Sequence, residues 1–172
     1  TMTKKDSPMH SHFQAYLERL ATLHNDIVTV LDRLPQAALD WKPAPAMNSI
    51  AVLIAHSAGA ETYWIGDVTL RRSSERVRAT EFTVGGLDHA DLKARLDQAL
   101  ADAQATLAQL TIEQLTEERY APSQERNFTV GWCLLHALEH TATHVGHVQL
   151  MGDMWERLHV ERHVERREEL NP

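Results

Sequence analysis

Residues 129–158 read TVGWCLLHALEHTATHVGHVQLMGDMWERL. Within this stretch, apolar residues and histidines recur at steps that alternate between four and three, at Cys133, Ala137, His140, His144, His147, Met151, Met154 and Leu158. Such steps mark the face by which a helix packs against other helices. The pattern predicts a helix over 129–158 whose core-facing side carries three consecutive histidines, and histidines in a core need compensating partners.

Three further segments show helical spacing of their apolar residues, and none shows the sustained alternation of a long strand. The first is predicted over 7–34, with Ser7 as its N-cap and Pro8 in its first position. The second and third are predicted over 49–70 and 88–110. Four helices of similar length joined by loops predict an all-α four-helix bundle.

The segments outside these helices contain residues that interrupt or end helices. A proline-rich connector is predicted over 41–47, and polar loops are predicted over 71–88 and 122–127. Residues 159–172 are highly charged and are predicted to form a C-terminal extension outside the core. A length of 172 residues suits one domain, so we expect residues 1–172 to form a single bundle domain.

The composition argues against several other classes of protein. Lys and Arg number 17 against 24 Asp and Glu, and this net charge of −7 disfavours nucleic-acid binding, which depends on neutralising phosphates. The single cysteine, Cys133, excludes an intramolecular disulfide framework. The longest apolar run, 50–55, is far shorter than the roughly 20 residues of a membrane span, and no apolar stretch follows the charged N-terminus. We therefore expect a cytoplasmic protein without nucleic-acid or membrane partners.

Three of the eleven histidines are placed to bind one metal ion. His140 and His144 lie one helical turn apart, so their side chains share a helix face. His56 lies on the inward stripe of the second predicted helix and supplies a third nitrogen. Zinc sites with three protein ligands keep an open position for water or substrate, whereas structural zinc is usually enclosed by four ligands. The spacing predicts an open metal site formed by His56, His140 and His144.

Two neighbouring histidines compete for a place in this site. His147 lies on the same predicted face and fits either a ligand or a residue that lines the pocket. His136 begins an H-x-x-E-H pattern that ends at His140, in which Glu139 would be the base of a zinc peptidase. That pattern leaves His144 without a role, so we disfavour it.

Histidines also occur in cores for structural reasons. A hydrated network of imidazoles in a helical interaction protein is therefore the structural alternative to a metal site. The six remaining histidines fall in predicted surface or terminal positions and are expected to be solvated: His10, His12, His24, His89, His159 and His163.

Three stretches of sequence carry a resemblance to a known family. They are WKPAPAMNSIAVLIAH at 41–56, ETYW at 61–64 and HTATHVGH at 140–147. In these stretches the chain resembles the DinB-like superfamily of four-helix bundles, which includes bacillithiol- and mycothiol-dependent enzymes. The similarity extends over about residues 13–158, and the order of the predicted helices agrees with it.

The resemblance implies a function for the predicted site. The metal triad of the family falls on His56, His140 and His144, and the family implies a divalent ion, most often zinc or nickel. In characterised branches it implies a metal-dependent transferase that activates a low-molecular-weight thiol. A non-enzymatic bundle that binds a metal or a small ligand is the alternative. A homodimer is a further expectation, because Trp64 and Trp155 are predicted to leave aromatic surface free.

Overall fold

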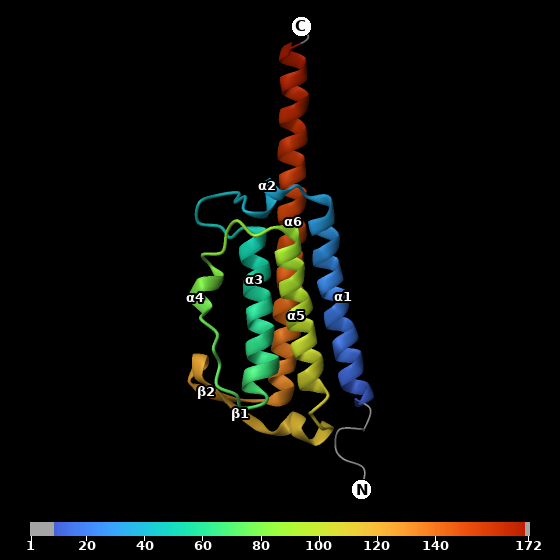
Figure 1. Ribbon diagram of the computed structural model, residues 1–172, viewed down its shortest axis with the longest axis vertical. Helices are drawn as coiled ribbons and strands as arrows, with labels where there is room; N and C mark the ends of the chain where they lie inside the picture. Colours follow the sequence, from blue (N-terminus) through green and yellow to red (C-terminus); the bar gives the residue numbers. More distant parts are fainter. Residues whose placement is uncertain (1–8, 171–172) are drawn as a thin grey trace.

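The computed structural model describes the backbone of residues 9–170 and the side chains of residues 9–159. Four long helical segments run side by side (Figure 1): α1 (Ser11–Arg33), α3 (Ile50–Glu61) continued by the π-helix η1 (Thr62–Val68), α5 (His89–Leu107) and α6 (Val130–Leu170). The connections contain α2 (Gln36–Leu39), α4 (Arg78–Glu81) and the 3₁₀ turns η2 (Ile112–Thr116) and η3 (Pro122–Gln124). The predicted four-helix bundle is confirmed.

A short hairpin lies at the end of the bundle where α6 begins (Figure 1). Strands β1 (Glu118–Ala121) and β2 (Arg126–Thr129) pair antiparallel, with Glu118 opposite Thr129 and Ala121 opposite Arg126. The residue pattern predicted only a loop here. Strands of four residues are too short for a period of two to stand out, and tertiary packing of Ala121 and Phe128 in the core stabilises the hairpin.

Both ends of the bundle differ from the predicted helix limits. Helix α1 begins at Ser11 after an N-cap at His10, while the cap predicted at Ser7 lies outside the described residues. Helix α6 continues to Leu170 rather than ending near Leu158, and its last turns extend beyond the other helices (Figure 1). The charged residues after Leu158 include many Glu and Arg, which are good helix formers.

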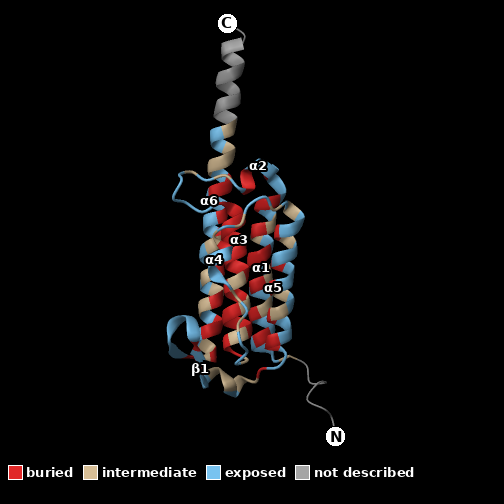
Figure 2. Cartoon of the chain, turned by 60° about the vertical axis from the view of Figure 1, so that its left-hand side comes forward, coloured by how far each residue is buried: buried red, intermediate tan, exposed pale blue. Residues whose placement is uncertain are grey.

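Helix α3 lies inside the bundle and is buried on almost every side (Figure 2). The Oγ of Ser49 caps its N-terminus by accepting from the backbone N–H of Val52 at 3.3 Å. A helix that is apolar all round must be covered all round. Helices α5 and α6 pack against it, and α4 with the segment around it covers a further side. His56 is therefore held on a rigid, enclosed element.

The buried face of α6 departs from the predicted seam. Among the residues whose side chains are described, its buried positions after Cys133 are Leu134, Ala137, Thr141, Val145, Val148, Met151 and Gly152. An ideal α-helix drifts by about 20° per heptad from a strict seven-residue repeat, so the buried stripe moves away from a seam extrapolated over several heptads. The prediction of three core-facing histidines is wrong in this respect. His140 and His144 lie half-buried at the edge of the stripe, and His147 is exposed.

None of the helices, over the residues described here, is both long enough and apolar enough to cross a membrane.

Candidate metal centre

Helices α3 and α6 bring the three predicted ligands together. His56 comes from α3, and His140 and His144 come from consecutive turns of α6. One nitrogen from each imidazole lies within 4.8 Å of the corresponding nitrogen of the other two. Nε2 of His56 and Nε2 of His140 are 3.2 Å apart. In the part of the chain whose side chains are described, this is the group of three suitable side chains close enough to hold one ion.

Glu81 fixes the orientation of His56. Its Oε2 lies 2.8 Å from Nδ1 of His56, while Arg76 donates to both carboxylate oxygens. Burial favours the neutral form of Glu81, but the hydrogen bonds from Arg76 and His56 outweigh it and lower the pKa of the carboxyl group. The ionised Glu81 therefore accepts a hydrogen bond from Nδ1–H of His56, which leaves the lone pair on Nε2 directed at the cluster.

Neither Glu81 nor Arg76 was predicted from the sequence. Both lie in the segment 71–88, which was predicted to be a polar loop. No periodicity marks them, because α4 has only four residues and Glu81 meets His56 across 25 positions of sequence. A carboxylate behind a metal-binding histidine is common, but its place in the sequence is variable.

The two candidate ligands on α6, His140 and His144, are held in the neutral form. Burial, followed by the nearby His144 and His56, lowers the pKa of His140 to about 3. Burial and the same His56 lower the pKa of His144 to about 4. Neutral imidazole is the form that binds metal ions. At neutral pH these two candidate ligands are therefore uncharged rather than a repulsive pair of cations.

The residues fit a divalent ion of the zinc type. Ligand nitrogens at 2.0–2.1 Å from a tetrahedral zinc ion are about 3.3 Å apart, and the measured separation between Nε2 of His56 and Nε2 of His140 is 3.2 Å. The donor set and the spacing thus suit a metal, with room for further ligands from solvent.

The two competing histidines lie outside the group of three. Nδ1 of His147 is 3.3 Å from Nδ1 of His144, so His147 contacts a candidate ligand from the solvent side. His136 stacks on Trp132, with ring centroids 4.7 Å apart. Glu139, the base of the alternative peptidase pattern, is exposed. The geometry thus favours His144, and not His136, as the companion of His140.

His24 is the clearest correction among the other histidines. It was expected on the surface, yet it is buried and its Nε2 lies 2.9 Å from Oε2 of Glu61, which is also buried. Thr141 donates to the other oxygen of Glu61 at 2.7 Å. Helices α1, α3 and α6 are therefore joined by a polar cluster within the core. The partners of His24 are distant in sequence, so its helical position alone did not reveal them.

The expectation of solvated side chains holds only in part for the other histidines. His12 is exposed, whereas Nε2 of His89 lies 2.9 Å from the carbonyl oxygen of Leu34. His10 accepts from the backbone N–H of His12, and His159 stacks on Trp155. The side chain of His163 lies outside the described residues.

A pocket of about 360 Å³ adjoins the histidine cluster. His56 and His140 form part of its lining, and Trp64, Phe128, Trp132 and His136 supply an aromatic wall. Trp64 itself is buried, so it does not provide the free aromatic surface on which a homodimer was expected. The pocket gives a small molecule access to two of the three histidines.

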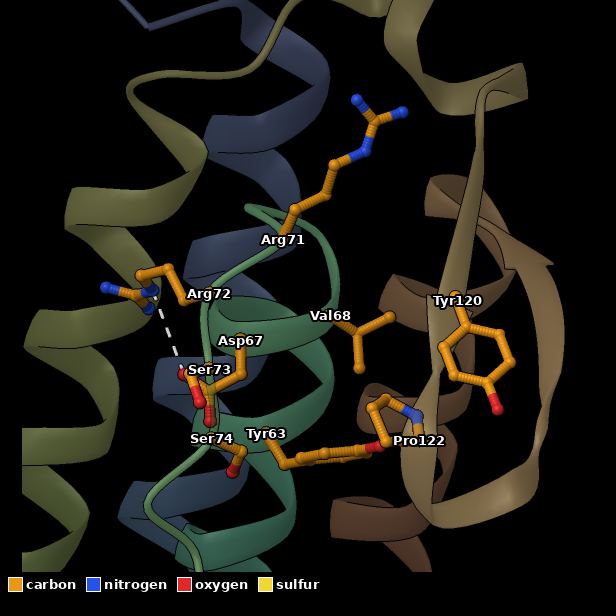
Figure 3. A pocket seen from close by; sticks show the side chains of 9 residues that line it. All are labelled: Tyr63, Asp67, Val68, Arg71, Arg72, Ser73, Ser74, Tyr120 and Pro122. Carbon is orange, nitrogen blue, oxygen red and sulfur yellow. Dashed lines mark ion pairs between the residues drawn. The ribbon is translucent and has the colours of Figure 1, made fainter.

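A larger pocket of about 560 Å³ lies elsewhere, between η1 and the hairpin (Figure 3). Val68, Tyr63, Tyr120 and Pro122 form its apolar sides. Figure 3 shows Arg72 paired with Asp67, at 3.7 Å between Nε and Oδ1. The lining contains no histidine, and its carboxylate, Asp67, pairs with Arg72, so the smaller pocket beside the three histidines is the better candidate for chemistry.

The fold and the cluster together define a class of protein, a bundle of long helices that holds three histidines between two of them beside a pocket. Comparison with family models then identifies the family. The model described as the DinB superfamily matches residues 19–148, which is most of the chain. The chain belongs to the DinB superfamily.

Solved structures share this fold. A DinB-like protein from Bacillus subtilis is 20% identical, with a TM-score of 0.63, over 83% of this chain and 92% of that chain. A conserved protein from Enterococcus faecalis is 18% identical, with a TM-score of 0.67, over 81% and 94%. A mycothiol-dependent maleylpyruvate isomerase is 15% identical, with a TM-score of 0.59, over 84% of this chain and 62% of that chain. At such identities the likeness concerns the fold alone. A search of curated proteins gave no match.

Proposed function

We propose that the chain binds one divalent metal ion, zinc or nickel, through His56, His140 and His144, and acts as a transferase on a low-molecular-weight thiol. The observation that carries the proposal is that three imidazole nitrogens lie within 4.8 Å of one another beside a pocket. Three protein ligands leave a position for an exogenous ligand, as in catalytic zinc sites. The likeness of fold to a mycothiol-dependent isomerase supports a small thiol as that ligand.

The residues around the site have separable tasks. Glu81 accepts from Nδ1–H of His56 and so directs Nε2 of this ring toward the ion. Burial keeps His140 and His144 neutral. A bound divalent ion would lower the pKa of a coordinated thiol and so supply a thiolate at neutral pH.

The thiol must come from outside the chain. Cys133 is the single cysteine of the sequence and is fully buried. Burial raises the pKa of its thiol to about 11. It also lies seven residues before His140, or about 10 Å along the helix. Cys133 therefore packs in the core, and a small-molecule thiol is the nucleophile.

A non-enzymatic metal or ligand carrier is the second candidate. The described lining of the pocket contains no Asp or Glu side chain that could act as a general base. A transferase that uses a metal-bound thiolate needs no such general base, because ionisation of the thiol is already complete. A carrier needs none either, so activity must decide between the two.

The test is conjugation of thiols to chlorodinitrobenzene by the zinc- or nickel-loaded chain. The panel contains bacillithiol, mycothiol, glutathione and cysteine. We expect metal-dependent conjugation with at least one thiol, its loss in His140→Ala, and no change in His12→Ala, which alters an exposed histidine. Circular dichroism checks that the variants are folded. Metal binding without conjugation of any thiol would contradict the transferase and favour the carrier.

A further inference from the structure

Two arginines line the pocket beside the histidine cluster and make no salt bridge among the described residues. Arg78 comes from α4 and Arg126 from β2, on the same side of the bundle (Figure 1). Each guanidinium lies over a phenyl ring, Arg78 at 4.8 Å from the centroid of Phe82 and Arg126 at 4.3 Å from that of Phe128. Stacking on a ring leaves the N–H donors around the rim of a guanidinium available to an anion.

No acidic side chain among the described lining residues offsets these two charges. Glu81, the carboxylate of α4, is already bound by Arg76 and His56. The pocket is therefore locally positive although the whole chain carries a net charge of −7. Phe82 links Arg78 to the histidine cluster, because its ring also contacts His56 at 4.8 Å between centroids.

The aromatic wall adds to this polarity. Trp132 is stacked on Phe128 at 4.0 Å and on His136 at 4.7 Å between centroids. The indole thus has two rings stacked on it, and 39% of the Trp132 residue is exposed. The edge of an aromatic ring carries the positive end of its quadrupole. A planar ligand that carries a negative charge suits such a wall.

We propose that this pocket binds a small planar carboxylic acid whose carboxylate is held by Arg78 and Arg126. Arginine binds carboxylates through paired N–H groups, which explains two free guanidiniums at one pocket. A volume of about 360 Å³ is at the small end of the range for small-molecule sites. This proposal rests on the proposed function where it makes the acid the electrophilic co-substrate of the thiol. The binding of the carboxylate itself requires only the pocket.

The experiment measures binding of trans-cinnamate and of its neutral amide to the zinc-loaded full-length chain by isothermal titration. We expect cinnamate to bind at least about tenfold more tightly than the amide, since a charge-assisted hydrogen bond is lost. Arg78→Gln and Arg126→Gln should each weaken cinnamate binding by about tenfold or more. Arg95→Gln removes the same charge from an exposed position on α5 and should change nothing.

Three results would overturn the assignment: no cinnamate binding to the wild-type chain, equal binding of acid and amide, or arginine variants that behave like Arg95→Gln. Repeating the titration after removal of metal with EDTA excludes simple coordination of the carboxylate by zinc. Zinc binding without arginine-dependent cinnamate binding contradicts this assignment alone. Arginine-dependent cinnamate binding in a chain that binds neither zinc nor nickel contradicts the proposed function alone.

Discussion

At the scale of single residues, the candidate site depends on which nitrogen of His56 is free. Nδ1 is engaged by Glu81 at 2.8 Å, and Glu81 is held ionised by Arg76. This arrangement fixes the tautomer and the plane of the ring before any ion arrives. Carboxylates placed behind ligating histidines in this way typically contribute 10- to 100-fold to metal affinity.

Glu81→Gln tests this role. The amide cannot hold the Nδ1–H of His56 as strongly, so we expect the affinity for zinc to fall by about 10- to 100-fold. Competition with a chromophoric chelator measures it. Glu75→Gln, an exposed residue of the same segment, is the matched control. Equal zinc affinity in the two variants would show that Glu81 does not position His56.

Local spacing in the sequence was enough to bring some residues of the candidate site together and not others. His140 and His144 are one turn apart on one helix, so they share a face whichever residues of that helix are buried. His147 was misplaced because the heptad repeat was extrapolated too far along α6. Glu81 and His24 were missed because their partners are 25 and 37 positions away in sequence, beyond any periodic signal.

At the scale of elements, a buried polar cluster links three helices by hydrogen bonds next to the candidate site. Glu61 of α3 accepts hydrogen bonds from Thr141 of α6 and pairs with His24 of α1. Oγ of Ser57 lies 3.4 Å from Oγ1 of Thr141. These two residues directly follow the candidate ligands His56 and His140. The register between α3 and α6, and with it the spacing of the histidines, is therefore set partly by this cluster.

A double-mutant cycle on His24 and Glu61 measures the coupling free energy between these two side chains. Removing one member of a buried hydrogen-bonded pair leaves the other without its partner, and this typically costs about 1–3 kcal/mol of unfolding free energy. We expect His24→Ala and Glu61→Ala each to destabilise the chain by that order in urea. The double variant should be far less destabilised than the sum of the two. Additive losses would mean that the pair is not coupled.

Two glycines of α6 test how closely it approaches α1. A Cβ at Gly152 would lie 2.8 Å from Cγ1 of Val30, whereas a Cβ at Gly146 would meet nothing within 4 Å. We expect Gly152→Ala to destabilise by about 1–3 kcal/mol through overpacking. Gly146→Ala should stabilise by up to about 1 kcal/mol through helix propensity. Thermal or urea unfolding of the metal-free chain measures both, and shifts of the same sign would contradict the packing described.

The elements differ in how far their sequence determined them. Helices α1, α3, α5 and α6 each carry several turns of periodic apolar residues, so their existence followed from pattern alone. The hairpin β1–β2 did not, because its four-residue strands are defined by pairing across the turn and by packing of Phe128. The end of α6 was also missed, since charge was interpreted as a tail although Glu and Arg favour helix.

At the scale of the whole molecule, the neutral histidines make stability depend on pH. In the folded chain the pKa of His140 is about 3 and that of His144 about 4, against about 6.5 for a free imidazole. Between these values the unfolded chain binds more protons than the folded chain. Their contribution to stability is thus complete above pH 6.5 and is lost progressively as the pH falls toward 4.

Urea unfolding of the metal-free chain between pH 7.5 and pH 4.5 checks this dependence. The free energy of unfolding should decrease with falling pH in the wild-type chain. The double variant His140→Gln, His144→Gln should show a flatter profile, because the groups that take up the protons are absent. Parallel profiles for the two chains would place the acid sensitivity elsewhere.

The central claim, an open metal site formed by His56, His140 and His144, is tested most directly by metal stoichiometry. Tag-free chain exchanged into zinc or nickel and freed of excess ion is analysed by mass spectrometry of the elements. The account predicts about one ion per chain in the wild type and in His12→Ala, and loss of the ion in His56→Ala. Less than about 0.2 ions per wild-type chain, or stoichiometric metal retained by His56→Ala, would contradict it.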